Sequence, residues 1–168
     1  MPKIIENLPQ RLSEEARRQI EQSGFSAMTI RSVAKGCGVG VGTVYNYYPS
    51  KEALVATFML DDWSACIAQI QACAGEAQTV EPVLLTIHEK LRLFMEQYDP
   101  IFRDEAANAS YTAATSRYHG MLRNQLTAPL SKFCRDAFTA EFIAEAMLTW
   151  TVAGKDFDDL RAILLRII

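Results

Sequence analysis

Residues 29–48 read TIRSVAKGCGVGVGTVYNYY, and this segment constrains the fold more than any other part of the chain. In its first half, apolar residues recur at positions i, i+3 and i+4 after Thr29, a good N-cap residue, which predicts a short helix. Alternating glycines follow and predict a tight turn. A second short helix is expected from about Val41 to Tyr47. Two short helices joined by a glycine turn are typical of a helix-turn-helix.

The second of these helices is predicted to present an uncharged outer face. Its apolar positions and those of the first helix form a small core, with the members Ile30, Val33, Ala34, Val39, Val44 and Tyr48. The residues left outside are small or carry hydroxyl or amide groups: Val41, Gly42, Thr43, Tyr45, Asn46 and Tyr47. Such side chains suit hydrogen bonds to phosphate oxygens and contact with thymine methyl groups. A helical hairpin with no partner is the alternative, but it would leave an aromatic ring exposed.

Charge is distributed unevenly along the chain. The 168 residues carry a net charge of −3, which argues against indiscriminate nucleic-acid binding. Residues 1–51, however, contain seven basic and four acidic side chains, a net charge of +3, and the rest of the chain carries −6. The N-terminal third is therefore the part that a phosphate backbone would attract.

The hydrophobic pattern predicts an all-α chain. The N-terminal three-helix bundle, with the helix-turn-helix, is expected over residues 1–50, and a helical ligand-binding and dimerisation domain over 51–168. A long helix rather than a flexible tether joins these two domains. The helices are expected at about 9–23, 30–36, 41–47, 51–74, 80–98, 101–109, 111–138, 140–153 and 157–168, with a break at Asp99-Pro100 and a candidate interruption at Pro129.

The segment TIRSVAKGCGVGVGTVYNYYPSKEALV resembles the signature of the TetR (tetracycline repressor) family, and the strong resemblance covers about residues 9–58. The usual form has a Thr, a small helix ending in Ala-x-x-x-Gly-Val, and then Tyr-x-(Tyr/His)-Phe-x-(Ser/Asn)-Lys-x-x-Leu. Two positions depart from it. Gly40 stands where a Ser or Thr often caps the recognition helix, and Tyr48 replaces the commoner Phe. The rest of the chain agrees with the family in its helical plan.

The resemblance implies a sequence-specific transcriptional regulator, a repressor that a small-molecule ligand releases from its DNA operator. It also implies the residues that meet DNA. Thr29 would contact phosphate, and Thr43 would lie in the major groove beside Val41 and Gly42. Tyr45 and Tyr47 would bind phosphates on either side of the groove, and Lys51 would make a charged phosphate contact. Asn46 would contact the DNA backbone or a base.

The last two expected helices are more apolar than the surface helices of a monomer. The first carries Phe142, Ile143, Ala146, Met147 and Trp150, and the second carries Phe157, Leu160, Ile163, Leu164, Ile167 and Ile168. The resemblance implies that these helices pair with their copies across a two-fold axis, as a four-helix bundle in a homodimer. An intramolecular core is the alternative.

The middle helices carry aromatic and apolar side chains that suit a pocket for a small apolar or aromatic effector. The candidates are Trp63, Ile67, Ile70, His88, Leu91, Phe94, Met95, Tyr98, Tyr111, Tyr118 and Met121. The same residues equally suit a plain core, and the pattern does not separate the two. The resemblance implies that the ligand favours a conformation whose recognition helices are wrongly spaced for successive major grooves, roughly 34–36 Å apart. The helix expected over 51–74 would transmit that change.

Several other classes of protein are disfavoured. The N-terminus has no continuous apolar run and no segment is an uncharged apolar stretch of membrane-spanning length, so we expect a cytoplasmic protein. The four cysteines form no CxxC pair and the two histidines lie far apart, so no metal or cofactor is expected. Cys66 and Cys73 would share a helix face, either as a redox pair or as two small buried residues.

No pair of nucleophile and base and no phosphate-binding loop stands out, which argues against an enzyme. Two alternatives to a ligand-controlled repressor stay open. One is a helical adaptor that binds protein. The other is a regulator that needs no small-molecule ligand, or that activates transcription.

Overall fold

The computed structural model describes residues 7–104 and 119–168, and all regular secondary structure in these ranges is helical. The chain divides into two compact units. The first contains the chain up to Asp61 and the segment that begins at Tyr98, and the second contains Asp62–Gln97 and the C-terminal part. This division lies further along the chain than the predicted boundary at 50/51, because the buried residues Leu54 and Phe58 extend the core of the first unit.

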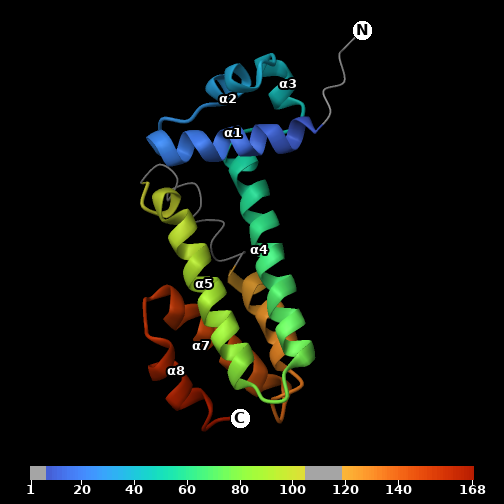
Figure 1. The fold of residues 1–168 in the computed structure, drawn as a ribbon, viewed down its shortest axis with the longest axis vertical. Helices are drawn as coiled ribbons and strands as arrows, with labels where there is room; N and C mark the ends of the chain where they lie inside the picture. The colour runs from blue at the N-terminus through green and yellow to red at the C-terminus, as the bar shows by residue number, and fades with distance from the viewer. Residues whose placement is uncertain (1–6, 105–118) are drawn as a thin grey trace. The chain divides into compact units, whose positions relative to one another are not determined.

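The first unit is built on α1 (Leu8–Ser23), which lies against α2 (Ile30–Cys37), and α2 in turn contacts α3 (Val41–Tyr45) (Figure 1). The predicted stripe on α1 is confirmed, since its buried residues recur every four positions: Leu8, Leu12, Ala16 and Ile20. Gly24 ends α1 with φ of 82° and donates its N–H to the Ile20 carbonyl. A glycine adopts this left-handed region without a Cβ clash.

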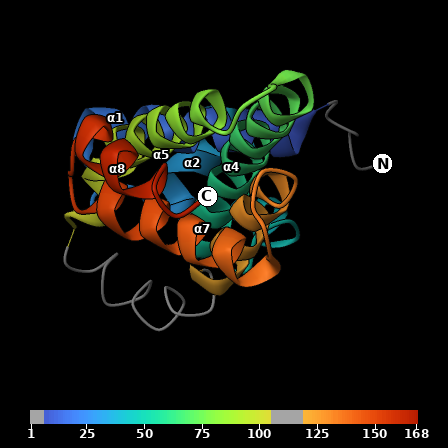
Figure 2. The same ribbon diagram turned by 90° about the horizontal axis from the view of Figure 1, so that it is seen from below.

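The second unit contains most of α4 (Lys51–Glu76) and of α5 (Glu81–Phe102), the helical residues 119–130, α7 (Ala137–Val152) and α8 (Phe157–Leu164). In Figure 2, α7 runs beside α8, and these two helices contact each other. The core takes side chains from each of these helices, among them Trp63, Ile87, Leu126, Ile143 and Leu160. Burial of these side chains is the main stabilising contribution in such a bundle.

Two prolines were predicted to interrupt helices, and the structure contradicts the first prediction only. The predicted break at Asp99-Pro100 is wrong, because α5 continues through Pro100 to Phe102. Pro100 lies in the last turn, where it removes one helical hydrogen bond, and the buried Ile101 holds that turn in place. The candidate interruption at Pro129 lies close to the observed one: the helical residues 119–130 end just after Pro129, eight residues before the predicted end at 138, and residues 131–136 form turns and bends.

The ends of the last two helices also differ from prediction. α7 starts at Ala137, three residues earlier than expected, because the Asp136 carboxylate accepts a hydrogen bond of 2.7 Å from the Thr139 N–H. α8 ends at Leu164, and residues 165–167 form a turn. Most of the helix predicted over 101–109, and the start of the one predicted over 111–138, lie outside the described residues.

One helix in the described ranges, α4, is long and apolar enough to cross a membrane, with a mean hydropathy of 1.2 over its most apolar window. Most of its large apolar side chains are buried, among them Leu54, Phe58, Trp63, Ile67 and Ile70. A core helix in a helical protein has the same length and composition.

Candidate DNA-binding surface

The short helix α3 is held by its inner residues and leaves its outer face open. Val44 is fully buried, and Tyr48, with 7% of its surface exposed, turns back into the core. Asn46 and Tyr47 form a turn instead of the predicted end of the helix, because the chain must bring Tyr48 inward before Pro49. Gly40 gives α3 no side-chain cap, as the sequence led us to expect.

The residues predicted to meet DNA surround this face. Tyr45 and Tyr47 have 53% and 50% of their surface exposed, and Gly42 and Asn46 are also exposed. Val41 and Thr43 are partly exposed. In this short segment, large aromatic side chains therefore project into solvent from a rigid support, which is an arrangement suited to hydrogen bonding with phosphates.

A capping box fixes the start of α2. The Ser32 N–H donates to Thr29 Oγ1 at 3.0 Å, and the Thr29 N–H donates to Ser32 Oγ at 3.1 Å. Ser32 Oγ also lies 2.5 Å from Oε1 of Gln19 on α1, to which it donates. Thr29 is exposed, so the predicted N-cap is confirmed and its side chain stands at the surface.

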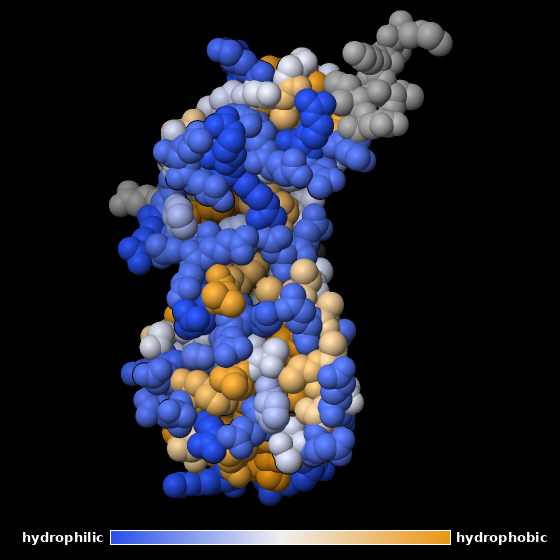
Figure 3. All heavy atoms as spheres, in the orientation of Figure 1, coloured by the Kyte–Doolittle hydropathy of each residue, from blue (hydrophilic) through white to orange (hydrophobic). Residues whose placement is uncertain are grey.

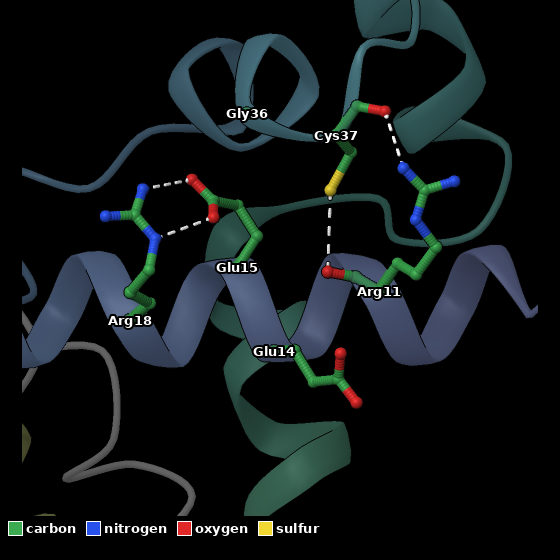
Figure 4. A pocket seen from close by; sticks show the side chains of 6 residues that line it. All are labelled: Arg11, Glu14, Glu15, Arg18, Gly36 and Cys37. Carbon is green, nitrogen blue, oxygen red and sulfur yellow. Dashed lines mark hydrogen bonds and ion pairs between the residues drawn. The ribbon is translucent and has the colours of Figure 1, made fainter.

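Glu15 lies at the centre of a charged hollow of about 230 Å³ between α1 and α2 (Figure 4). The hollow is lined by Arg11, Glu14, Glu15, Arg18, Gly36 and Cys37. Hydrogen bonds from Arg18 and Gln19 lower the pKa of the Glu15 carboxyl from 4.5 to about 2. Gly36 leaves room for this carboxylate, since a Cβ there would lie 2.2 Å from Glu15 Oε1.

Cys37 forms the other wall of the hollow. Its thiol lies 3.4 Å from the Arg11 carbonyl, and the Arg11 guanidinium donates to the Cys37 carbonyl at 3.1 Å. Burial raises the pKa of the Cys37 thiol, which makes it a poor nucleophile. The contacts that line the hollow thus hold α1 against α2. Sequence reasoning missed them and placed Gly36 at the end of the helix, although it lies inside α2.

Lys51, predicted to contact phosphate, is half-buried at the start of α4. Its ammonium donates to the carbonyls of Phe25 at 3.1 Å and Met28 at 3.4 Å. The same nitrogen lies 4.2 Å from the centre of the Phe25 ring, a cation–π distance. The side chain is therefore engaged with the turn that precedes α2.

The predicted effector-binding residues lie mostly in the core of the second unit. Trp63, Ile67, Ile70, His88 and Leu91 are buried, and Phe94, Met95 and Met121 are partly buried. Their polar atoms have protein partners. Trp63 Nε1 donates to Gln125 Oε1 at 2.6 Å, and His88 Nε2 lies 3.0 Å from the Lys155 carbonyl.

Tyr98 does not belong with these residues. It lies in the first unit, where its hydroxyl accepts a hydrogen bond of 3.0 Å from Arg17 and its ring stacks on Phe58. Tyr111 and Tyr118 lie outside the described residues. The structure thus brings Trp63 and Phe94 into contact, with ring centres 5.5 Å apart, and places Tyr98 elsewhere.

The predicted dimer residues fall into two groups. Ile143, Met147, Leu160 and Leu164 belong to the core of the second unit, and Ala146 and Ile167 pack against it. Phe142, Trp150 and Ile163 have 48%, 49% and 61% of their surface exposed. Sequence reasoning missed Phe138, which is 75% exposed and precedes Phe142 by one helical turn, so the i, i+4 spacing could have revealed it. Apolar side chains also reach the surface of this unit in Figure 3, separated by polar ones.

No cluster of three or more histidine, cysteine or acidic side chains that could hold a metal ion occurs in residues 7–104 and 119–168. The cysteines, including Cys66 and Cys73, are free thiols.

The first unit is similar to known regulators in sequence. A family model for bacterial regulatory proteins of the tetR family matches residues 12–57. The HTH-type transcriptional regulator UidR of Escherichia coli K12 is 30% identical over 61 residues, which are 36% of this chain. That match spans 31% of UidR, so the chain covers about a third of this curated relative's length.

Solved structures share the fold over nearly the whole chain. The TetR family repressor AlkX from Dietzia sp. has a TM-score of 0.64 at 15% identity and covers 95% of each chain. The transcriptional regulator SCO7518 of Streptomyces coelicolor has a TM-score of 0.69 at 14% identity, over 94% of this chain and 96% of its own. The multidrug binding protein EbrR has a TM-score of 0.61 at 19% identity, over 95% and 94%. The predicted all-α architecture with a helix-turn-helix is therefore confirmed.

Proposed function

We propose that the chain is a member of the tetR family of bacterial regulatory proteins and a sequence-specific transcriptional regulator that represses its target genes. The observation that carries this proposal is the outer face of α3, where Tyr45 and Tyr47 are half exposed while Val44 and Tyr48 anchor the helix. Phosphate and base edges are the partners that such hydroxyl and amide groups suit.

Each predicted DNA-binding residue has a proposed role, and that of Lys51, at the start of α4, is a charged phosphate contact. Thr43, Val41 and Gly42 enter the major groove, Tyr45 and Tyr47 bind phosphates on either side of it, and Asn46 touches backbone or base. Thr29 meets a phosphate at the start of α2, where the helix N-terminus favours an anion. The net charge of +3 on residues 1–51 supports this assignment.

We propose that the regulator is a cytoplasmic homodimer. The exposed apolar residues Phe142, Trp150 and Ile163 support a self-complementary interface on α7 and α8. A two-fold axis would place two copies of α3 in successive major grooves, roughly 34–36 Å apart. Of the predicted interface residues, the buried Ile143, Met147, Leu160 and Leu164 would support this surface from beneath.

A small apolar or aromatic effector is proposed to bind the second unit and to lower the affinity for DNA. The aromatic pair Trp63 and Phe94 supports this class of ligand, and the buried His88, whose ring lies 5.6 Å from that of Phe157, adds a polar group to the same unit. Two structural neighbours also point to apolar or aromatic ligands: EbrR is described as a multidrug binding protein, and AlkX as implicated in biodegradation of n-alkanes.

A gel-shift assay tests the proposal. The wild type and Tyr47→Ala are compared on the DNA upstream of the gene that encodes this chain, at two salt concentrations. We expect a specific shift that weakens with salt and that Tyr47→Ala abolishes. A folded wild type that shifts neither this DNA nor any fragment selected from genomic DNA would favour a protein-binding adaptor instead.

A further inference from the structure

We infer that Gln125 determines which effectors the second unit accepts: its amide N–H group binds a carbonyl oxygen on an uncharged molecule with an apolar or aromatic body. The inference rests on the proposed function, which places an effector in this unit, and it names the polar group that such an effector carries. Gln125 lies on the helical residues 119–130 and is not among the effector-binding residues predicted from the sequence.

Trp63 fixes the orientation of the Gln125 amide. The indole N–H of Trp63 donates to Gln125 Oε1 at 2.6 Å. An indole nitrogen can only donate a hydrogen bond, so the carbonyl end of the amide faces Trp63 and the NH2 end points elsewhere. Trp63 is only 2% exposed, and loss of this acceptor would leave a buried donor unpaired. The pairing therefore selects one of the two orientations that an amide group can adopt.

The Nε2 group of Gln125 keeps its N–H donors for a further partner. Within the described parts of the chain, it has no hydrogen-bond acceptor. Polar atoms of the predicted effector-binding residues are already engaged, since Trp63 Nε1 donates to Gln125 and His88 Nε2 lies 3.0 Å from the Lys155 carbonyl. The amide of Gln125 thus offers uncommitted donors next to the aromatic pair.

Contacts of Trp63 bring three helices of the second unit together at this amide. Trp63 belongs to α4 and Phe94 to α5, and the two rings meet edge to face with their centres 5.5 Å apart. Gln125 reaches Trp63 from the helical residues 119–130. Phe94 and Gln125 are partly exposed, as is Met121, about one turn before Gln125, so these groups are open to a small molecule from outside the core.

The surroundings of the amide favour an uncharged ligand. Trp63, Phe94 and Met121 carry no charge, so an ionised ligand group beside them would lose hydration without gaining an opposite charge. A carbonyl oxygen can accept a hydrogen bond from the amide N–H while the rest of the molecule packs against the aromatic rings. Ketones, esters and lactones with an apolar or aromatic body have this chemistry.

The test uses the full chain and two probes of matched shape, acetophenone and ethylbenzene, which differ in the carbonyl oxygen. Binding is followed by NMR at the indole N–H of Trp63, assigned with Trp150→Phe because the chain has two tryptophans. Gln125→Glu keeps an acceptor for Trp63 and removes the N–H donors. The side-chain amide signal of the wild type that this variant lacks belongs to Gln125. Gln71→Glu, at an exposed glutamine of α4, is the control for the added charge, and thermal melting checks the fold.

In the wild type, we expect both probes to shift the Trp63 signal and only acetophenone to shift the side-chain amide signal of Gln125. The ratio of the acetophenone affinity to the ethylbenzene affinity should fall about fivefold or more in Gln125→Glu, the effect of about one hydrogen bond, and should stay unchanged in Gln71→Glu.

An equal ratio in Gln125→Glu and wild type, or a Trp63 signal that neither probe shifts up to its solubility limit, would overturn the inference. Failure of the proposed function gives a different result. A folded wild type that enriches no duplex from random-sequence DNA would overturn that function, and the NMR signals of Trp63 and Gln125 would still decide whether the amide binds a carbonyl oxygen.

Discussion

Glu15 and Gly36 illustrate how single residues join two helices of the DNA-binding unit. The absence of a Cβ at Gly36 lets the Glu15 carboxylate lie against α2, within reach of Arg18 and Gln19. Sequence reasoning placed Gly36 at the end of a helix, although it lies inside α2, because a contact between α1 and α2 has no signature in the local pattern. The contacts of Lys51 with the Phe25 and Met28 carbonyls were not foreseen for the same reason, because these acceptors lie 26 and 23 residues away.

Glu15 predicts a pH-dependent contribution to stability. Its pKa in the folded chain is about 2, below the usual 4.5, so the contribution is complete above pH 4.5 and is lost as the pH falls towards 2. The free energy of unfolding of the wild type should therefore exceed that of Glu15→Gln at neutral pH by at most about 1 kcal/mol, since the ion pair is partly exposed. Denaturant titrations at several pH values measure the difference. A difference that persists unchanged down to pH 2 would contradict the assignment.

The two exposed tyrosines are expected to act through their hydroxyl groups. Tyr47→Phe should leave the melting temperature unchanged, because the side chain is half exposed, and should lower DNA affinity about tenfold, the value of about one hydrogen bond. Tyr48→Phe, at a buried neighbour, is the matched control and should bind DNA like the wild type. Fluorescence anisotropy with a labelled duplex gives both affinities. Equal affinity of Tyr47→Phe and wild type would remove Tyr47 from the DNA contacts.

At the scale of elements, the sequence predicted helices well wherever periodicity and a cap agree. α1 and α2 begin and end within about two residues of expectation, because the apolar stripe and Thr29 or Gly24 define them locally. Pro100 misled the prediction, since packing of neighbours such as Ile101 outweighs the loss of one hydrogen bond. Tertiary packing of this kind is not encoded within a single window of sequence.

Arg17 is the side chain that connects α1 with α4 and α5. Its guanidinium donates to the Phe58 carbonyl at 3.1 Å and to the Tyr98 hydroxyl at 3.0 Å, and it covers the Phe58 ring at 4.3 Å. We expect Arg17→Met to lower the free energy of unfolding by about 2 kcal/mol, because charged hydrogen bonds in a partly buried site are lost. Tyr98→Phe, which removes one acceptor, should lower it by about 1 kcal/mol. Urea denaturation measures both, and a Tyr98→Phe variant less stable than Arg17→Met would contradict this ranking.

At the scale of the whole molecule, the sequence could predict that α7 and α8 are apolar but not which residues face outward. α7 carries large apolar side chains on its exposed face as well as its buried face, so periodicity gives no direction for its faces. The predicted effector-binding residues could not be distinguished from core residues either, because a ligand pocket and a hydrophobic core have the same composition. Only the folded structure shows that Ile163 is exposed and that Ile143 is fully buried.

This separation predicts opposite effects of two substitutions. Ile163→Glu should convert the proposed dimer to a folded monomer, because it places a charge in the proposed interface. Ile143→Ala should keep the dimer and lower the free energy of unfolding by about 2–4 kcal/mol, since it leaves a cavity in the core. Sedimentation velocity reports the assembly and thermal melting the stability. A dimer that survives Ile163→Glu would exclude this face of α8 as the interface.

The central claim is that α2 and α3 recognise a specific DNA sequence. It is tested most directly by selection from random-sequence duplex DNA with the wild type and, in parallel, with the double variant Tyr45→Ala, Tyr47→Ala. The account predicts that the wild type enriches a sequence with two-fold symmetry, whose half-sites lie about one helical turn apart, and that the folded double variant enriches nothing. Enrichment of the same sequence by both proteins, or of none by a folded wild type, would contradict it.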